Sequence, residues 1–176
     1  MNMPDTNQTT RREFLGSSST ILAGALAAPA ILSSRAFAAE NSDTLRIGLI
    51  GCGGRGSGAA GNCIESSPNV ELYAMGDAFK DRLEGARRNL QNGYKDSVNV
   101  TDERCFVGLD AYKQVLAQPV DMVILATPPG FRPIHFPAAI AANKHVFFEK
   151  PVATDGPGIR AVLAAAEEAT RKKLNV

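Results

Sequence analysis

Residues 45–56 read LRIGLIGCGGRG, a short apolar run that ends in a cluster of glycines. The run over residues 45–50 is typical of a buried strand, because it is short and almost wholly apolar. The glycines match the pattern G-x-G-x-x-G, which is weak alone but gains value between a strand and a helix. Because a helix is predicted over residues 55–65, this stretch predicts a strand–turn–helix unit.

The sequence beyond this unit alternates apolar runs with segments of helical periodicity. Further strands are predicted over residues 70–75, 105–107, 120–125 and 145–148, and further helices over residues 81–92, 111–116, 133–142 and 158–173. Residues 94–103 are polar and irregular, as in a surface loop. This alternation predicts an α/β fold, a doubly wound parallel sheet (Rossmann fold) with helices on both faces. Ligands of such sheets bind beyond the carboxyl ends of the strands.

Two local features refine the predicted helices. Gly58, Ala59 and Ala60 are small residues at which the first helix could press closely on the sheet. Asn92 and Gly93 are expected to end the second helix, because both residue types favour helix C-termini.

Composition limits the class of protein. The chain has 176 residues, 44% of them hydrophobic, and a net charge of +1, which fits one ordinary domain with an appendage. A nucleic-acid-binding protein would normally carry a basic excess, so that class is not favoured. Cys52, Cys63 and Cys105 have neither zinc-ligand spacing nor the pattern of a disulfide framework, and no metal site is predicted. We expect Cys52 to be a small buried residue rather than a redox thiol.

Residues 1–38 have the layout of an export signal. The segment RREFL at residues 11–15 precedes a modest apolar stretch, and AFA at residues 36–38 forms an A-x-A cleavage site. Twin arginines followed by Phe-Leu match the signal that the twin-arginine (Tat) export machinery reads. Glycine, proline and serine interrupt the apolar stretch, which makes it a poor membrane anchor. We predict cleavage after Ala38 and a periplasmic domain over residues 39–176; the alternative is an amphipathic helix packed on the domain.

The glycine cluster predicts a phosphate-binding turn. Gly51 permits the tight turn, Gly53 lets the backbone approach a pyrophosphate, and Gly56 allows close packing of helix on strand. Gly54 and Arg55 open the helix, whose free N–H groups would face the phosphates. The alternative is a plain strand-to-helix turn without a ligand.

Asp77 follows the second predicted strand, 26 residues beyond Gly51. A carboxylate at this place accepts hydrogen bonds from the adenosine ribose diol and repels a 2′-phosphate, so NAD is favoured over NADP. Lys80 and Arg82 lie close behind and could offset that repulsion. The alternative role for Asp77 is that of a simple helix cap.

Two further motifs carry a family resemblance. Residues 126–129 read ATPP and end the fourth predicted strand, and residues 144–151 read KHVFFEKP and end the fifth. Together with the glycine turn and His135, which precedes an alanine-rich run, they resemble the Gfo/Idh/MocA oxidoreductase family. The resemblance covers residues 44–176, and its most specific part is the Glu-Lys-Pro segment.

The resemblance implies roles for individual residues. Ala126, Thr127 and Pro128 would line the cofactor cleft, and Glu149 would help to hold the cofactor. Lys150 would contact the nicotinamide end and the substrate hydroxyl. His135 would lie on the helix beside the cleft, where a capping or packing role fits equally well.

Lys150 suits this task on chemical grounds. Oxidation of a sugar alcohol requires a base that removes the hydroxyl proton while hydride leaves the carbon. A lysine beside a cationic nicotinamide and away from bulk water can have its pKa lowered toward neutrality. The alternative is a solvated surface lysine.

The function expected from these features is hydride transfer between a nicotinamide cofactor and a sugar or polyol. One alternative is an NAD-dependent glycosidase similar to glycoside hydrolase family 109, and another is a non-catalytic NAD-binding fragment. Family members continue into a C-terminal α/β domain that binds the substrate and forms the dimer face. We therefore expect this chain to lack the last strand of the sheet and the substrate domain, to be inactive alone, and to derive from a homo-oligomeric parent.

Overall fold

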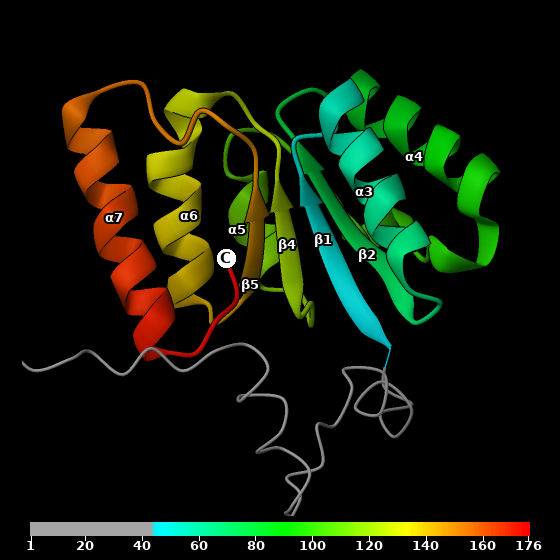
Figure 1. Cartoon of the computed structure of the whole chain (residues 1–176). Helices are drawn as coiled ribbons and strands as arrows, with labels where there is room; N and C mark the ends of the chain where they lie inside the picture. The colour runs from blue at the N-terminus through cyan, green and yellow to red at the C-terminus, as the bar shows by residue number, and fades with distance from the viewer. Residues whose placement is uncertain (1–43) are drawn as a thin grey trace, which may run out of the picture. The chain divides into compact units, whose positions relative to one another are not determined.

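The computed structural model describes residues 44–176, so the predicted export signal and its cleavage site lie outside the described residues. In the described part, parallel strands form one sheet in the order β3-β2-β1-β4-β5 (Figure 1). The strands are β1 (Leu45–Ile50), β2 (Val70–Asp77), β3 (Cys105–Val107), β4 (Met122–Leu125) and β5 (His145–Phe148). The order changes direction between β1 and β4, which confirms the predicted doubly wound sheet.

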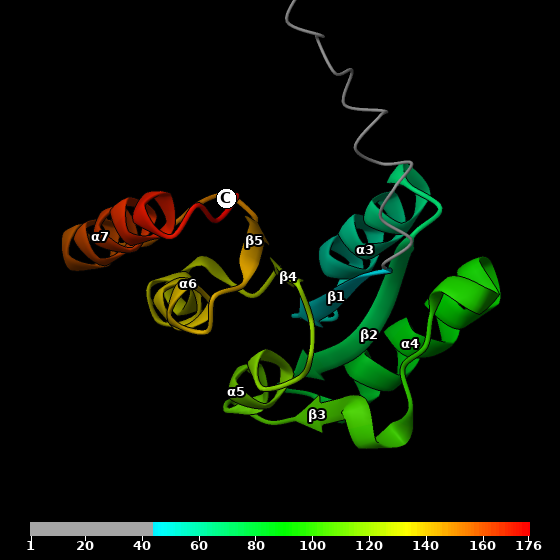
Figure 2. The same ribbon diagram turned by 90° about the horizontal axis from the view of Figure 1, so that it is seen from below.

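Helices cover both faces of this sheet. They are α3 (Gly54–Ser66), α4 (Lys80–Tyr94), α5 (Ala111–Leu116), α6 (Arg132–Ala141) and α7 (Gly156–Arg171). Figure 2 shows α3 and α4 on one side of the strands and α5, α6 and α7 on the other. Short 3₁₀ turns lie at Lys95–Ser97 (η2), Asp102–Arg104 (η3) and Pro129–Phe131 (η4).

Alternating side chains of the central strands fill two cores. Ile47 and Leu49 of β1 belong to the core under α3 and α4, and Ile50 belongs to the core under α5, α6 and α7. Because β1 and β4 are buried on both faces, they are apolar runs rather than alternating patterns, as the sequence predicted.

The structure corrects two details of the predicted helices. In α3 the residue Gly58 is exposed, whereas Gly56, Ala59, Ala60 and Gly61 are buried, because the helical period turns Gly58 outward. α4 does not end at Asn92-Gly93 but continues to Tyr94, whose hydroxyl group donates to Glu65 at 2.8 Å. A Cβ atom on Gly61 would lie 2.6 Å from this hydroxyl oxygen, so a larger residue there would displace the Tyr94 side chain.

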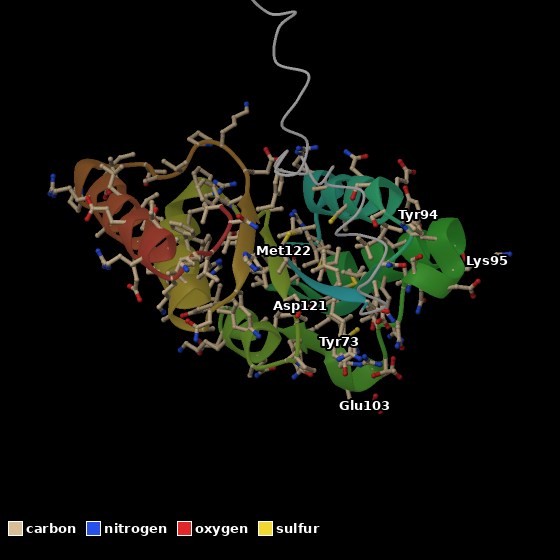
Figure 3. The ribbon with its side chains drawn as sticks, turned by 60° about the horizontal axis from the view of Figure 1, so that its bottom comes forward. Tyr73, Tyr94, Lys95, Glu103, Asp121 and Met122 are labelled. Carbon is tan, nitrogen blue, oxygen red and sulfur yellow. The ribbon has the colours of Figure 1, made fainter. Side chains whose placement is uncertain are left out.

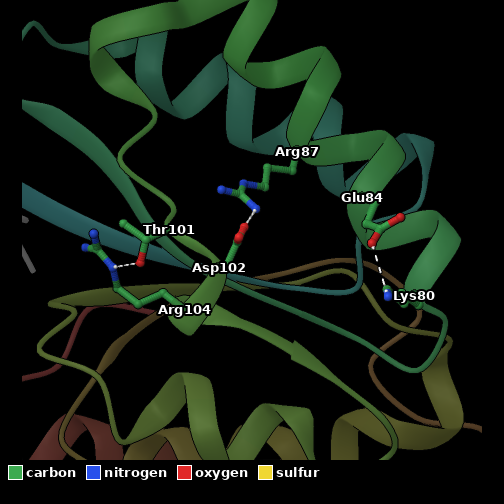
Figure 4. A network of polar contacts seen from close by, with 6 residues as sticks. All are labelled: Lys80, Glu84, Arg87, Thr101, Asp102 and Arg104. Atoms are coloured by element: carbon green, nitrogen blue, oxygen red, sulfur yellow. Dashed lines mark hydrogen bonds and ion pairs between the residues drawn. The ribbon is translucent and has the colours of Figure 1, made fainter.

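Two polar contacts fix the places where β3 and β4 begin. At the end of the sheet seen in Figure 3, the Asp121 carboxylate accepts a hydrogen bond from the Arg46 backbone N–H at 2.8 Å, which ties the start of β4 to the start of β1. Figure 4 shows the Arg87 guanidinium of α4 donating to Asp102, at the turn that leads into β3. The first contact fixes the start of β4 beside β1, and the second fixes the turn before β3 against α4.

After α7 the chain returns to the sheet. The Val146 N–H of β5 donates to the Asn175 carbonyl at 3.0 Å, and the Asn175 N–H donates to Nδ1 of His145 at 2.9 Å. Residue 175 therefore lies beside β5, while a sixth strand beyond residue 176 stays a prediction. Within residues 44–176, no helix has the length and apolar character needed to cross a membrane.

Candidate nucleotide-binding site

A cleft of about 690 Å³ opens at the carboxyl ends of the strands, on either side of the point where the strand order reverses. The predicted site residues that line it are Gly51, Gly53, Arg55, Asp77, Ala126, Thr127, Pro128, His135, Glu149 and Lys150. They follow β1, β2, β4 and β5, so four strand ends that are distant in sequence supply one surface. Gly54 and Gly56 do not line the cleft: Gly54 is exposed at the start of α3 and Gly56 is buried.

The glycine turn has the geometry that each glycine was expected to provide. Gly51 has φ of +97°, a conformation that side chains disfavour. A Cβ atom on Gly56 would lie 1.9 Å from the Gly51 carbonyl oxygen, so α3 can approach β1 only with glycine there. Gly53 is different, because a Cβ atom there would meet no atom within 4 Å. The space above Gly53 belongs to the cleft and stands free for a ligand.

Asp77 links two loops at one end of the cleft. One oxygen of its carboxylate accepts the Cys52 N–H of the glycine turn at 2.6 Å, and the other accepts the Phe79 N–H at 2.9 Å. The alternative role as a helix cap is wrong, because Phe79 is the residue at the cap of α4 and no side chain caps that helix. Each carboxylate oxygen retains a lone pair that a ribose hydroxyl can use.

His135 lies in the wall formed by the end of β4. Its Nδ1 atom is 3.3 Å from the Thr127 hydroxyl oxygen, and its ring stacks on Tyr112, with the ring centroids 4.3 Å apart. Phe131 stacks on the same ring at 5.7 Å. Burial lowers the pKa of His135 to about 4, so the ring is neutral at physiological pH. His135 therefore packs against two aromatic rings and also lines the cleft, as its expected place on the helix beside the cleft requires.

Glu149 pairs with Arg55 across the mouth of the cleft. The Arg55 Nε–H donates to the Glu149 carboxylate at 2.6 Å, and a second guanidinium nitrogen contacts the same oxygen. This hydrogen bond and the charge of Arg55 lower the pKa of Glu149. The glycine turn and the end of β5 are thereby joined, although they are 94 residues apart in sequence.

Lys150 borders the cleft, but its side chain is exposed. It makes no hydrogen bond or ion pair with the other residues of the described part. The expectation that Lys150 lies away from bulk water is therefore wrong for residues 44–176 alone, because no element of this part covers it. Its place at the end of β5 and at the edge of the cleft is as predicted.

The remaining geometry fits a dinucleotide. The N-terminus of α3 points at the open space over Gly53, where its free N–H groups can bind a pyrophosphate. The aromatic and apolar side chains of Phe79, Leu109 and Tyr112 also line the cleft. No three His, Cys, Asp or Glu side chains of residues 44–176 gather as a metal site would require.

Comparison with known proteins identifies the family. A model of the oxidoreductase family with an NAD-binding Rossmann fold, Gfo/Idh/MocA, matches residues 45–176. The chain belongs to this family. The resemblance inferred from the motifs is thereby confirmed, and residues 45–176 are a Rossmann domain of the NAD-binding kind.

Three Gfo/Idh/MocA-related proteins illustrate the similarity. Inositol 2-dehydrogenase 4 of Saccharopolyspora erythraea is 32% identical over 132 residues, covering 75% of this chain and 36% of the relative. A glycosyl hydrolase family 109 protein of Solibacter usitatus is 30% identical, over 84% of this chain and 34% of the relative. The crystal structure of the WlbA dehydrogenase from Bordetella pertussis with NADH and UDP-GlcNAcA has a TM-score of 0.58 and 28% identity, over 74% of this chain and 34% of that one. The chain spans about a third of the length of these relatives.

Sequence reasoning missed several residues of the Gfo/Idh/MocA cleft. They are Phe79, Leu109, Tyr112, Phe131 and Arg132. Each lies in the segment that follows the end of β2, β3 or β4, within seven residues of the strand, so the strand-end rule could have found them. Arg132 is the least expected, because its side chain is only 2% exposed although it begins a helix.

Cys52, in the glycine turn, has the structural role predicted for it. The side chain is 3% exposed, and its Sγ atom lies 3.5 Å from the Gly76 carbonyl oxygen. Burial raises the pKa of the Cys52 thiol, which therefore stays protonated at neutral pH.

Proposed function

We propose that the described domain binds NAD as the cofactor of an enzyme that oxidises or reduces a sugar or polyol. The observation that carries the proposal is the glycine turn. Gly51 and Gly56 are sterically required, while Gly53 faces the cleft that Asp77 also lines. The similarity to inositol 2-dehydrogenases supports the substrate class, because inositol is a polyol. The chain spans about a third of the length of these relatives, and we extend the proposal from NAD binding by this domain to the activity of the whole protein.

In this proposal each residue has a physical task. The N–H groups at the start of α3 bind the pyrophosphate, and Asp77 accepts hydrogen bonds from the ribose diol, which favours NAD over NADP. Bound NAD supplies a carbon that accepts or returns hydride. Lys150 holds the proton of the substrate hydroxyl at its Nζ atom, and Glu149 with Arg55 closes the mouth of the cleft.

Calorimetric titration of the chain with NAD and NADP tests the binding step. NAD is expected to bind more tightly. Gly53→Val is expected to abolish binding without lowering the melting temperature, because the new side chain meets only the space proposed for the pyrophosphate. Gly58→Ala, on an exposed turn of the same helix, is the matched control and keeps binding. Tighter binding of NADP, or NAD binding by Gly53→Val, contradicts the proposal.

The role of Lys150 requires a measurement of turnover on the complete gene product. Lys150→Ala is expected to lower kcat about 10²- to 10⁴-fold, the usual contribution of a positioned acid–base group, and to leave NAD bound. Near-normal turnover in this variant would remove Lys150 from the mechanism. We also propose that residues 44–176 alone bind the dinucleotide without turnover, and that the complete protein is a homo-oligomer, which light scattering tests.

A second candidate function is an NAD-dependent glycosidase. It is favoured by the similarity to the glycosyl hydrolase family 109 protein of Solibacter usitatus, which covers 84% of this chain. In such a reaction the cofactor oxidises the sugar transiently and reduces it again, so no NADH accumulates. Accumulation of NADH with a free polyol supports the dehydrogenase, and release of an aglycone without NADH supports the glycosidase.

We further propose export of the folded protein by the Tat machinery to the periplasm, without a stable membrane anchor. The support is the sequence RREFL at residues 11–15 together with AFA at residues 36–38. Replacement of Arg11 and Arg12 by lysine should retain a fused reporter in the cytoplasm. Unchanged export of this variant would refute the Tat assignment.

A further inference from the structure

Arg132 is a buried cation that the proposed mechanism does not use. It begins α6 and borders the cleft, yet its side chain is only 2% exposed. Its Nη1 atom donates to the Pro151 carbonyl oxygen at 2.6 Å, whereas its Nε–H is buried and has no hydrogen-bond partner among the described residues. Burying a guanidinium with so few partners costs free energy. A cation buried at this cost is expected to have a role, and its one hydrogen bond to the described residues shows which part of the chain it binds.

The group that Arg132 holds is the chain segment around Lys150. Immediately before it, the Glu149 N–H donates to the Leu125 carbonyl oxygen at 3.2 Å, and the Glu149 carboxylate is bound by Arg55. Immediately after it, the Pro151 carbonyl is bound by Arg132. The backbone is thus fixed on both sides of Lys150, while the Lys150 side chain remains free to reach into the cleft.

The two ties around Lys150 come from different parts of the cleft wall. Arg55 belongs to the start of α3, at the glycine turn, and Arg132 to the start of α6, which follows β4. The position of Lys150 is therefore fixed relative to the start of α3 and to the start of α6. A shift of about 1 Å at a reacting group can cost about 100-fold in rate, so such ties matter for a proton-transferring residue.

We propose that Arg132 is a positioning residue that fixes the Glu149–Pro151 segment through the Pro151 carbonyl and so sets where the Lys150 amine lies over the cleft. This inference rests on the proposed function, because it assumes that Lys150 faces the nicotinamide end of bound NAD. It predicts that losing Arg132 uncouples Lys150 from the bound cofactor while the rest of the cleft still binds NAD.

The test measures acetylation of individual lysines by mass spectrometry, across a range of pH, with and without NAD. In the unmodified chain, NAD is expected to slow acetylation of Lys150. Arg132→Met should still bind NAD by calorimetry but lose most of this protection. Arg132→Lys, which keeps the charge and a donor for the Pro151 carbonyl, should restore at least about half of it. In the complete gene product, Arg132→Met should lower kcat by about 100-fold, the scale of a small misplacement.

Lys144→Met is the matched control. The Lys144 amine also binds backbone carbonyls, those of Gln118 at 3.2 Å and Val120 at 2.7 Å, but near the start of β4, away from the cleft. It should lower the melting temperature while leaving the protection of Lys150 intact, which separates positioning from a general loss of stability. If Arg132→Met does not fold, Arg132→Gln, which keeps an N–H donor without the charge, takes its place and should show partial protection.

The outcomes are distinguishable. Failure of the unmodified chain to bind NAD overturns the proposed function and this inference with it. Binding of NAD without protection of Lys150 overturns the place that the proposed function gives to Lys150, and this inference with it. Full protection of Lys150 in Arg132→Met or Arg132→Gln overturns the inference alone. Equal loss of protection in Lys144→Met also overturns it, because the effect would then be one of stability.

Discussion

Replacing His135 by phenylalanine should remove much of the acid sensitivity of this domain. The ring of His135 is 4% exposed, and burial lowers its pKa from 6.5 to about 4. Between these two values the unfolded chain binds a proton that the native chain does not. The free energy of unfolding therefore falls as the pH falls, by about 1.4 kcal/mol per pH unit, and by about 3 kcal/mol over the whole interval. Above pH 6.5 the ring is neutral in both states and contributes no pH dependence.

Urea unfolding followed by circular dichroism measures this effect, since the chain has no tryptophan for fluorescence. His135→Phe keeps the stacking on Tyr112 and Phe131 but cannot take up a proton. The loss of stability between about pH 7.5 and about pH 4.5 should be smaller in the variant by about 2.5 kcal/mol. The comparison uses the change with pH, so the lost contact with Thr127 does not affect it.

His145→Asn is the control, because it removes the chain's second histidine and leaves His135 in place. It should retain the acid sensitivity assigned to His135. An equal loss of stability with acid in the unmodified chain and in His135→Phe would refute the reasoning, because carboxylates would then account for the whole effect.

Three further predictions concern the elements around the cleft. Gly56→Ala should lower the free energy of unfolding, measured with urea, by about 3 kcal/mol, because its Cβ atom would meet the Gly51 carbonyl oxygen. Gly58→Ala should raise it by about 0.5–1 kcal/mol, because its Cβ atom meets no other atom and alanine favours the helix. Asp155→Ala should cost about 1 kcal/mol in the same assay, because the Asp155 carboxylate caps α7 by accepting the N–H of its third residue at 2.7 Å; an unchanged midpoint would rule out the cap. Arg55→Met should raise the pKa of Glu149 back toward 4.5, as NMR titration of the carboxyl carbon can measure; an unchanged pKa would mean that the ion pair is absent in solution.

The sequence predicted those features whose signals are local. β1 and the glycine turn were predicted because an apolar run and a glycine pattern adjoin within residues 45–56, and β4 was predicted from the apolar run at residues 120–125. Asp77, Glu149 and Lys150 were placed at the cleft because the ends of parallel strands meet at one edge. The family resemblance supplied the roles of the last two residues.

The features that the sequence did not predict depend on contacts between distant segments. α4 continues past Asn92-Gly93 because Tyr94 is held by Glu65, a residue of the preceding helix. In the sequence, Arg132 looks like a surface residue at the start of a helix. In the structure it is buried, and it donates to the carbonyl of Pro151, 19 residues further along the chain. The exposure of Lys150 was missed for a related reason, because water exclusion depends on whatever covers the strand end.

Asp77 also bears on attempts to change the nucleotide that the domain accepts. Its carboxylate joins the loop after β1 to the loop after β2, through the N–H groups of Cys52 and Phe79. A substitution chosen only to admit an additional phosphate would therefore also release two backbone donors and loosen the turn. A redesign of the preference for NAD over NADP must therefore supply a new acceptor for both N–H groups. In homologues, a change at the position of Asp77 should be accompanied by a compensating change in one of these loops.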